Sequence, residues 1–139
     1  MASIIFNKCL DAAARAIIDF DTDTFYVLLL DNTFTPDKDT QEFRDDVNGD
    51  EVVGTGYTAG GVAATVTVTR DDVNNRIDIE LGAASWPTST ITARYAVYYK
   101  HRGGAASADE VVAAIDFGSD IVSTAGTFAL SASILRYQN

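Results

Sequence analysis

The single histidine, His101, is the first residue that could take part in acid–base or nucleophilic chemistry. It lies in the run Lys100-His101-Arg102-Gly103-Gly104, at the end of an expected strand. A Ser-His-Asp or Cys-His site needs a nucleophile and an orienting group beside the imidazole. The sequence offers no Gly-x-Ser-x-Gly motif. We therefore interpret His101 as a surface-loop residue, and the single cysteine, Cys9, as a small buried hydrophobic residue on the apolar face of a helix.

Three aspartates, Asp19, Asp21 and Asp23, alternate in the manner of a calcium-binding loop. An EF-hand also requires Gly at the sixth position and Glu at the twelfth, where this chain has Thr24 and Leu30. The EF-hand interpretation therefore fails. A solvated acidic turn before a strand is the favoured interpretation, and a looser Ca²⁺ site at the three aspartates stays open.

Other carboxylates lie in turns, where Asp is favoured because it hydrogen-bonds to nearby backbone. Paired carboxylates could cleave a glycosidic bond, but their separation depends on the fold, and the sequence singles out no pair. We predict no catalytic residues, no cofactor, no metal and no enzymatic activity. A hydrolase is the third-ranked alternative.

The glycine-rich segment from Gly54 to Gly61 superficially resembles a nucleotide-binding loop. Phosphate-binding loops deliver their ligand to a helix N-terminus, whereas a β-branched segment follows Gly61. We interpret these glycines as turn or bulge formers, with Tyr57 packed beside them.

A group of aromatic residues could stack on a sugar. It comprises Trp86, Tyr95, Tyr98 and Tyr99, although strand alternation places Tyr98 on the face opposite Tyr95 and Tyr99. We favour core aromatics over a carbohydrate platform.

The elements that must position these residues are mostly strands. Apolar spacing predicts one helix over 7–17, with Asn7 as its N-cap and a stripe of Cys9, Leu10, Ala13, Ala14 and Ile17. Seven or eight short β-prone runs follow, separated by turn signals. They cover 24–30, 62–69, 76–81, a short edge segment at 85–87, 90–100, 111–117 and 127–134, with a hairpin turn at 71–75 and a long polar loop over 33–50.

This pattern predicts an all-β fold, a jelly-roll-like antiparallel β-sandwich with one short N-terminal helix. The chain forms a single domain over 1–139, with residues 1–6 as a possible N-terminal arm. The predicted core consists of alternating strand residues: Phe25, Val27, Leu29, Val66, Val68, Ile77, Ile79, Ile91, Tyr95, Val97, Ile115 and Phe117.

Composition narrows the classes of partner. The 139 residues carry 10 basic and 20 acidic side chains, a net charge of −10, and 47% of them are hydrophobic. Such a chain has too much to bury to be disordered, and it offers no clustered basic charge for nucleic acid or anionic lipid. We expect no nucleic-acid or membrane partner. The first residues contain no apolar run long enough for a secretory signal, so we expect synthesis in a cytoplasm.

Five segments of the sequence resemble, in the same order, a family of small virion structural proteins of tailed bacteriophages. The resemblance spans nearly the whole chain and is carried by Thr35-Pro36-Asp37-Lys38-Asp39, Gly54–Gly61, Val68–Asp72, Trp86–Lys100 and Ala114–Gly118. Its members are similar to capsid decoration, or cement, proteins with a jelly-roll fold that lie on the outer surface of the capsid. The resemblance implies a partner, the major capsid protein, whose neighbouring subunits the chain would bridge to stabilise the head. The basic run at Lys100 departs from the acidic or small-residue loop expected there.

The alternative function is a structural or carbohydrate-binding module of the tail, fibre or neck. The sequence leaves the choice between head and tail open.

The predicted partner contact is the N-terminal arm, Ile4, Ile5 and Phe6. Three apolar residues before so short a helix must lie against the domain or against another protein, since leaving each exposed forgoes about 1.5–3 kcal/mol. We therefore expect the chain to form a dimer or a trimer, and this arm to take part in the interface or in the capsid contact.

Overall fold

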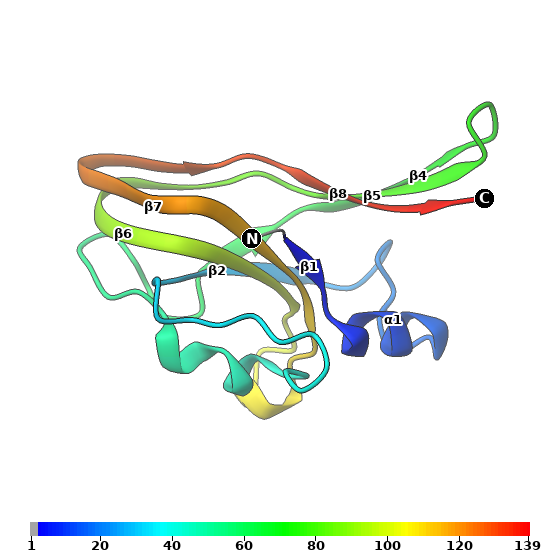
Figure 1. Cartoon of the computed structure of the whole chain (residues 1–139), viewed down its shortest axis with the longest axis horizontal. Helices are drawn as coiled ribbons and strands as arrows, with labels where there is room; N and C mark the ends of the chain where they lie inside the picture. The colour runs from blue at the N-terminus through cyan, green and yellow to red at the C-terminus, as the bar shows by residue number, and fades with distance from the viewer. Residues whose placement is uncertain (1–2) are drawn as a thin grey trace.

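The computed structural model describes residues 3–139 and has two antiparallel sheets packed as layers, with one short α-helix near the N-terminus (Figure 1). The predicted class, an all-β sandwich with a short N-terminal helix, is confirmed. The five-stranded sheet has the order β1-β7-β6-β2-β3 and the three-stranded sheet the order β4-β5-β8. No helix among residues 3–139 is long and apolar enough to cross a membrane.

The elements are these, in chain order: β1 (Ile4–Ile5), α1 (Asn7–Ala14), β2 (Phe25–Leu30), the 3₁₀ turns η1 (Arg44–Asp46) and η2 (Asn48–Asp50), β3 (Val62–Ala64), β4 (Val66–Asp71), β5 (Arg76–Leu81), β6 (Ala84–Lys100), η3 (Ala106–Ala108), β7 (Val111–Leu130) and β8 (Ser133–Gln138).

One long antiparallel ribbon supplies both layers. β6 pairs with β7 from Tyr99↔Val111 to Ala84↔Leu130, and β5 and β8 continue the same pairing from Leu81↔Ser133. Figure 1 shows the ribbon folding back over itself, so that β5 and β8 lie above the sheet that contains β6 and β7. The two predicted strands at 85–87 and 90–100 are therefore one strand, and the predicted run at 127–134 is divided between β7 and β8.

The fold-back coincides with irregular pairing. The β6–β7 register shifts between Trp86 and Ser89 and again between Ser89 and Ile91, and Ala125 on the facing strand has a φ of 46°. The hydroxyl of buried Ser89 lies 2.8 Å from that of Ser123, which in turn accepts the Ile91 N–H at 3.2 Å. Because bulges leave ladder groups unpaired, these serines satisfy the backbone where the ribbon bends.

A further register shift, between Ala93 and Tyr95, changes which residues of β6 share a face. Ile91 and Ala93 belong to the core between the layers, whereas Tyr95 and Val97 belong to a second core on the opposite face of the five-stranded sheet. The single in-phase face predicted from Ile91 to Tyr99 is therefore wrong, because the alternation reverses at this irregularity, where one residue of β6 lies opposite four residues of β7.

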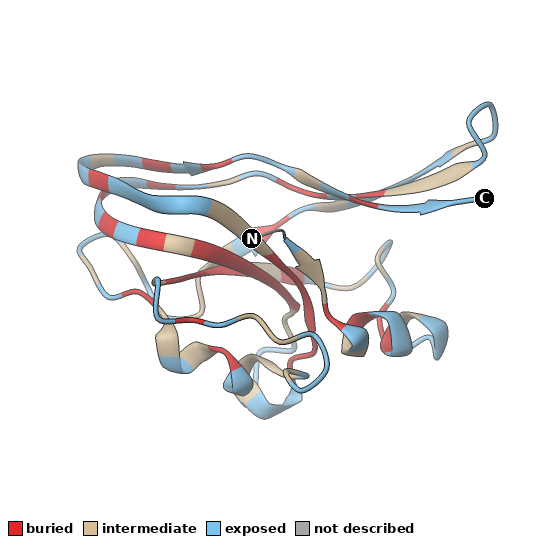
Figure 2. Cartoon of the chain, viewed as in Figure 1, coloured by how far each residue is buried: buried red, intermediate tan, exposed pale blue. Residues whose placement is uncertain are grey.

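The second core is covered by the long polar segment between β2 and β3. Phe34 and Val47 of that segment are buried against Leu28, Leu30 and Tyr99, and Phe34 meets Tyr95 edge-on at 5.3 Å. This explains how an 18-residue polar loop stays ordered in a small domain. Figure 2 shows the buried residues concentrated in the ribbon and in β2.

The predicted core list is right for seven of its twelve members. Val68 is 38% exposed, and the other four are partly buried: Val66, Ile77, Ile115 and Phe117. All five flank the space between the two layers, which this chain fills incompletely.

The helix is shorter than predicted. It ends at Ala14, and Ala16 has a φ of 58°, which a continuing helix does not allow. Phe6 occupies the N-cap position, so the predicted cap at Asn7 is wrong; the Asn7 side-chain amide instead donates to Asp39 at 2.7 Å.

We predict that Gly61→Ala destabilises the fold while Gly49→Ala does not. Gly61 has a φ of +76°, and a Cβ there would overlap the carbonyl oxygen of Val27, whereas a Cβ at Gly49 meets nothing within 4 Å. We expect Gly61→Ala to lower the free energy of unfolding by at least about 2 kcal/mol, measured by urea denaturation. Equal midpoints for the two variants would contradict this account of the β2–β3 contact.

Candidate interaction surfaces

The predicted N-terminal arm is part of the fold. Ile4 and Ile5 form β1 and pair with Ala114 and Ala113 of β7, and Phe6 is fully buried in the second core. Of the two expected placements, against the domain or against another protein, the structure shows the first for Phe6, which is too buried to be a partner contact. Ile4 and Ile5 remain partly buried and accessible at the sheet edge. Residues 1 and 2 of the predicted arm lie outside the described residues.

The two long sides of the sandwich differ. On one side the chain passes directly from β3 in the lower sheet to β4 in the upper sheet through Thr65, whose carbonyl accepts the Gly82 N–H at 2.7 Å. On the other side the sheets end at β1 and β8, and no strand of residues 3–139 passes between them. We call this second side the open side.

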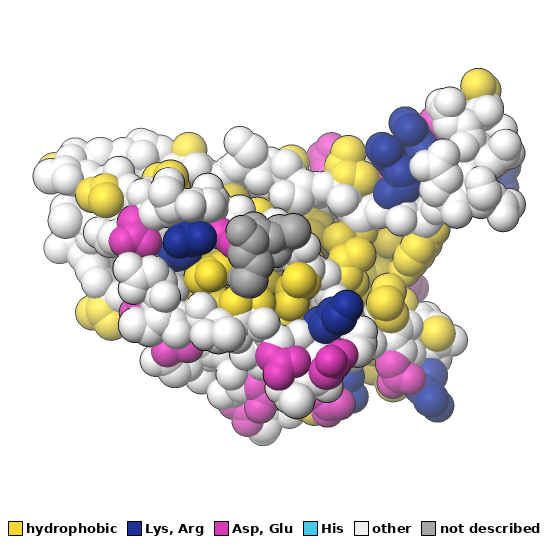
Figure 3. All heavy atoms as spheres, in the orientation of Figure 1, with side chains coloured by type: hydrophobic (Ala, Val, Ile, Leu, Met, Phe, Trp, Pro, Cys, Tyr) yellow, Lys and Arg dark blue, Asp and Glu magenta, His cyan; other side chains and the backbone are white. Residues whose placement is uncertain are grey.

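Side chains of both layers line a row of hollows along the open side. A hollow of about 410 Å³ lies between β1 and β8, lined by Ile4, Ile5, Ile115 and Leu135 among others, and one of about 300 Å³ adjoins it at Phe117. Figure 3 shows hydrophobic side chains between the upper layer and the body below it. The open side therefore presents apolar surface in depressions and not on a flat face.

A larger hollow, about 680 Å³, lies between α1 and the overhanging end of the three-stranded sheet. Leu10 of the helix is 43% exposed, and Val68 and Tyr137 of the sheet are 38% and 44% exposed. Leu10 belongs to the apolar stripe predicted for the helix, but only Cys9 and Ala12 of α1 are buried. The helix thus turns part of its apolar surface toward an incompletely filled space.

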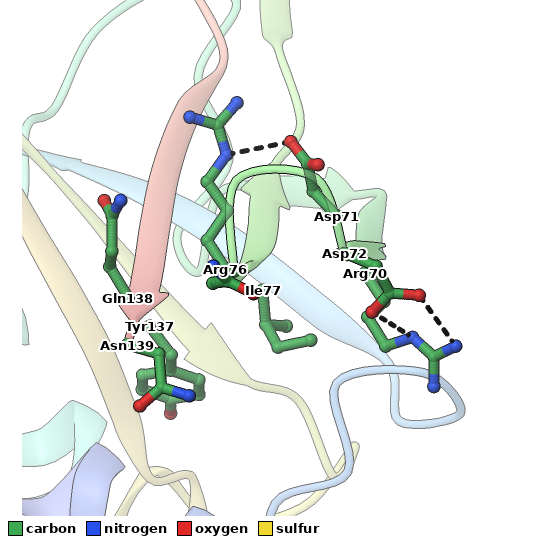
Figure 4. A pocket seen from close by; sticks show the side chains of 9 residues that line it. Arg70, Asp71, Asp72, Arg76, Ile77, Tyr137, Gln138 and Asn139 are labelled. Carbon is green, nitrogen blue, oxygen red and sulfur yellow. Dashed lines mark hydrogen bonds and ion pairs between the residues drawn. The ribbon is translucent and has the colours of Figure 1, made fainter.

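The tip of the overhang holds a polar hollow of about 370 Å³ (Figure 4). Its arginines are already paired, Arg70 with Asp72 at 3.1 Å and Arg76 with Asp71 at 3.3 Å. Figure 4 shows these side chains pointing toward one another and not into a shared centre. Beside the hollow, Arg136 donates to Asp78 at 2.6 Å, which holds the pKa of Asp78 below its ordinary value.

His101 and Cys9 do not meet in the structure as a catalytic pair would. The His101 ring stacks on Tyr26 with 3.9 Å between ring centroids, and it is partly buried, so the surface-loop interpretation is only partly right. Cys9 is buried, as predicted, and desolvation raises the pKa of its thiol to about 12. A thiol with so high a pKa is a poor nucleophile at neutral pH.

The basic run at the end of β6, Lys100 to Arg102, forms ion pairs that the sequence does not indicate. Lys100 pairs with Asp23 at 2.9 Å, and Arg102 donates to both carboxylate oxygens of Glu110, which is 4% exposed. Asp109, fully buried, accepts from Arg44 at 2.9 Å. These cations serve contacts within the chain, and only a long-range contact map could have predicted their partners.

The acidic turn is organised by its own backbone. Asp23 accepts the Asp19 N–H at 2.8 Å, and Asp19 accepts the Asp21 N–H at 2.9 Å, a bond that is the main cause of the lowered pKa of Asp19. Among residues 3–139, no cluster of three or more His, Cys, Asp or Glu is placed to hold a metal. The favoured interpretation as an acidic turn agrees with this geometry.

The glycine-rich segment and the aromatic group are structural. Tyr57 packs beside Trp86, with 6.1 Å between ring centroids, and its hydroxyl donates to Glu51 at 2.5 Å and accepts the Leu29 N–H at 3.0 Å. Trp86, Tyr98 and Tyr99 are each at most 2% exposed. The predicted core role of these aromatics is confirmed, and they present no face on which a sugar could stack.

Comparison with known proteins gives no relative: no protein-family model, no curated protein and no solved structure matches the chain.

We predict that Phe6→Ala is far more destabilising than Leu10→Ala. Phe6 is fully buried, so its truncation should cost about 3–5 kcal/mol, whereas half-exposed Leu10 should cost about 1 kcal/mol or less. Urea denaturation of the two variants checks this. Similar losses for the two variants would show that the N-terminal segment does not pack as described. Deletion of residues 2–6, which removes buried Phe6, is also expected to lower the free energy of unfolding.

We predict that Asp78→Asn lowers the melting temperature at pH 7 and has a diminishing effect in acid. The hydrogen bond from Arg136 lowers the pKa of Asp78 from 3.8, so its stabilisation is complete above that value and is lost as the pH falls through the lower, folded-state pKa. Thermal melts at pH 7 and below pH 3.8 measure the difference. Asp72→Asn, at a carboxylate whose side chain is 75% exposed, is the control and should change little.

Proposed function

We propose that this chain is a bacteriophage virion structural protein that decorates the outer surface of the capsid. In this role it bridges adjacent major capsid protein subunits and so stabilises the head, without catalytic activity. The observation that carries the proposal is the open side, where an apolar hollow lies between two sheet edges, β1 and β8, and a second hollow adjoins it along β7. Recessed apolar surface of this kind is typical of sites where another protein binds.

Two further features support this role. The five segments that resemble virion structural proteins are distributed between residues 35 and 118, and four of them lie within strands or pack against them. A cement protein also needs a body that transmits load without deforming. The folded-back ribbon, with two cores on opposite faces of one sheet, provides such a body.

The alternative is a structural module of the tail, fibre or neck. A carbohydrate-binding module would need exposed aromatic rings on which a sugar could stack, but Trp86 and the neighbouring tyrosines are buried. A purely structural tail role uses the same open side and is distinguished from the capsid role by stoichiometry.

Self-association is part of the proposal, as a dimer or a trimer. Ile4 and Ile5 are the members of the N-terminal segment that can still take part in such a contact or in the capsid contact. Because each copy carries −10, self-association must rely on apolar or backbone contacts and should weaken when salt is removed.

We predict that the protein is present in purified virions at a copy number comparable to that of the major capsid protein. A decoration protein binds a repeated site on the capsid, whereas a tail component is present in few copies. Quantitative mass spectrometry of intact particles, with the major capsid protein as internal standard, measures the ratio. A ratio at the level of tail proteins would overturn the capsid role, and absence from particles would overturn any virion role.

A further inference from the structure

The open side lacks one strand in its upper layer. β8 continues the line of β7, and β1 pairs with the outer edge of β7, so the five-stranded sheet extends one strand beyond the sheet above it. The space over β1 is the hollow of about 410 Å³, which residues of β1, β7 and β8 all line. A single extended strand placed there would lie over β1 and beside β8.

Hydrogen-bond directions show that β8 can accept such a strand. The Asn139 N–H donates to the Asn75 carbonyl oxygen at 3.0 Å, and the Gly82 N–H donates to Thr65 on the β4 side. Since antiparallel pairing alternates, odd-numbered residues of β8 bond to β5, and the backbone groups of Ile134, Arg136 and Gln138 point toward the open side. These are the unpaired groups of an edge strand.

We infer that the open side binds an extended, cationic, apolar-alternating segment of another protein, which adds to β8 as a fourth strand of the upper sheet and fills the hollow over β1. Backbone hydrogen bonds to β8 supply affinity in this mode, and the hollows select alternate side chains. Inward residues of the added strand share a face with Leu135 and Tyr137, so they must be apolar to contact Ile5 and Ile115.

Charge indicates that the occupant is a different protein. Two copies of a chain with net charge −10 repel each other, whereas a segment with basic flanks is attracted from a distance. The three-stranded sheet itself is nearly balanced, with three arginines against four carboxylates over residues 66–81 and 133–138. The remaining negative charge therefore lies on the rest of the chain. The inference deepens the proposed capsid role but does not require it.

The first experiment uses a defined peptide with the whole chain. The probe is Lys-Lys-Thr-Val-Thr-Val-Thr-Val-Lys-Lys, and the control replaces its central Val with Pro, which keeps the charge but interrupts the strand. In a ¹⁵N-correlation titration, we expect the probe to shift the amides of β8 and β1. No shifts at about 1 mM peptide, shifts elsewhere, or equal binding of the control would overturn the inference.

The second experiment tests the backbone contact by substitution. Ile134→Pro removes an outward N–H and leaves the bonds to β5 intact, and Ile134→Thr changes the same side chain but keeps the N–H. We expect Ile134→Pro to weaken binding of the probe about tenfold and Ile134→Thr about twofold at most. Equal effects would overturn strand addition. If Ile134→Pro does not fold, Ser133→Phe fills the hollow without altering the ladder and should also weaken binding.

A third experiment measures binding of the wild type and of Ile134→Pro to capsids that lack this protein, so that failure of the inference can be distinguished from failure of the proposed function. Binding of the peptide at β8 without binding of the protein to capsids refutes the capsid role and supports the strand-addition site. Equal binding of the wild type and Ile134→Pro to capsids refutes the site and leaves the capsid role intact. A dimer of the isolated protein in which the outward amides of Ile134, Arg136 and Gln138 are protected from exchange would identify a second copy as the occupant and overturn the inference.

Discussion

The structure depends on one constraint: a two-stranded ribbon must bend sharply enough to cover itself. A regular antiparallel pair twists but does not fold back, so the bend requires irregular pairing. The register shifts around Ser89 provide it, and the hydroxyls of Ser89 and Ser123 satisfy backbone groups that the shifts release. From this follow the two layers, the core between them and the position of β8 above β7. The open side follows as well, because the ribbon has the same width in both layers and only the lower one gains β1.

Sequence patterns identified the β class and the individual runs because alternation and turn residues are local signals. They failed where the structure depends on a local irregularity in the strand pairing. The run from Ile91 to Tyr99 alternates without a break in the sequence, yet the shift after Ala93 sends its two halves to opposite faces. The role of Phe6 was misjudged for a related reason, since its covering residues come from β7 and from the loop after β2, far along the chain. Buried Trp86 and Tyr98, by contrast, were correctly assigned to the core, because aromatic residues in alternating strands are usually packed.

The candidate interaction surface could likewise be predicted only in part from the sequence. Residue types could nominate an apolar segment near the N-terminus but could not reveal that two sheet edges lie beside it. The open side combines residues of β1, β7 and β8, which meet only because the ribbon folds back. The arginines illustrate the same point for charge. Arg44 and Arg102 pair with Asp109 and Glu110, two buried acids on the loop that leads into β7, and no local sequence pattern indicates these pairs.

The order of the strands has a consequence for synthesis on the ribosome. β1 pairs with β7, and β2 pairs with the short β3 on one edge and with β6 on the other. The β6 edge of β2 therefore stays unpaired until the chain has grown to Lys100, and β1 has no partner until it has grown past Ala114. The β4–β5 and β6–β7 pairs, whose strands are adjacent in the sequence, can close with a modest loss of chain entropy. Leu28, Leu29 and Leu30 lie beyond the β2–β3 pairing, and their ladder partners, Val97, Ala96 and Tyr95, are made much later. The early apolar segment of the nascent chain therefore stays incompletely covered until β6 has been synthesised.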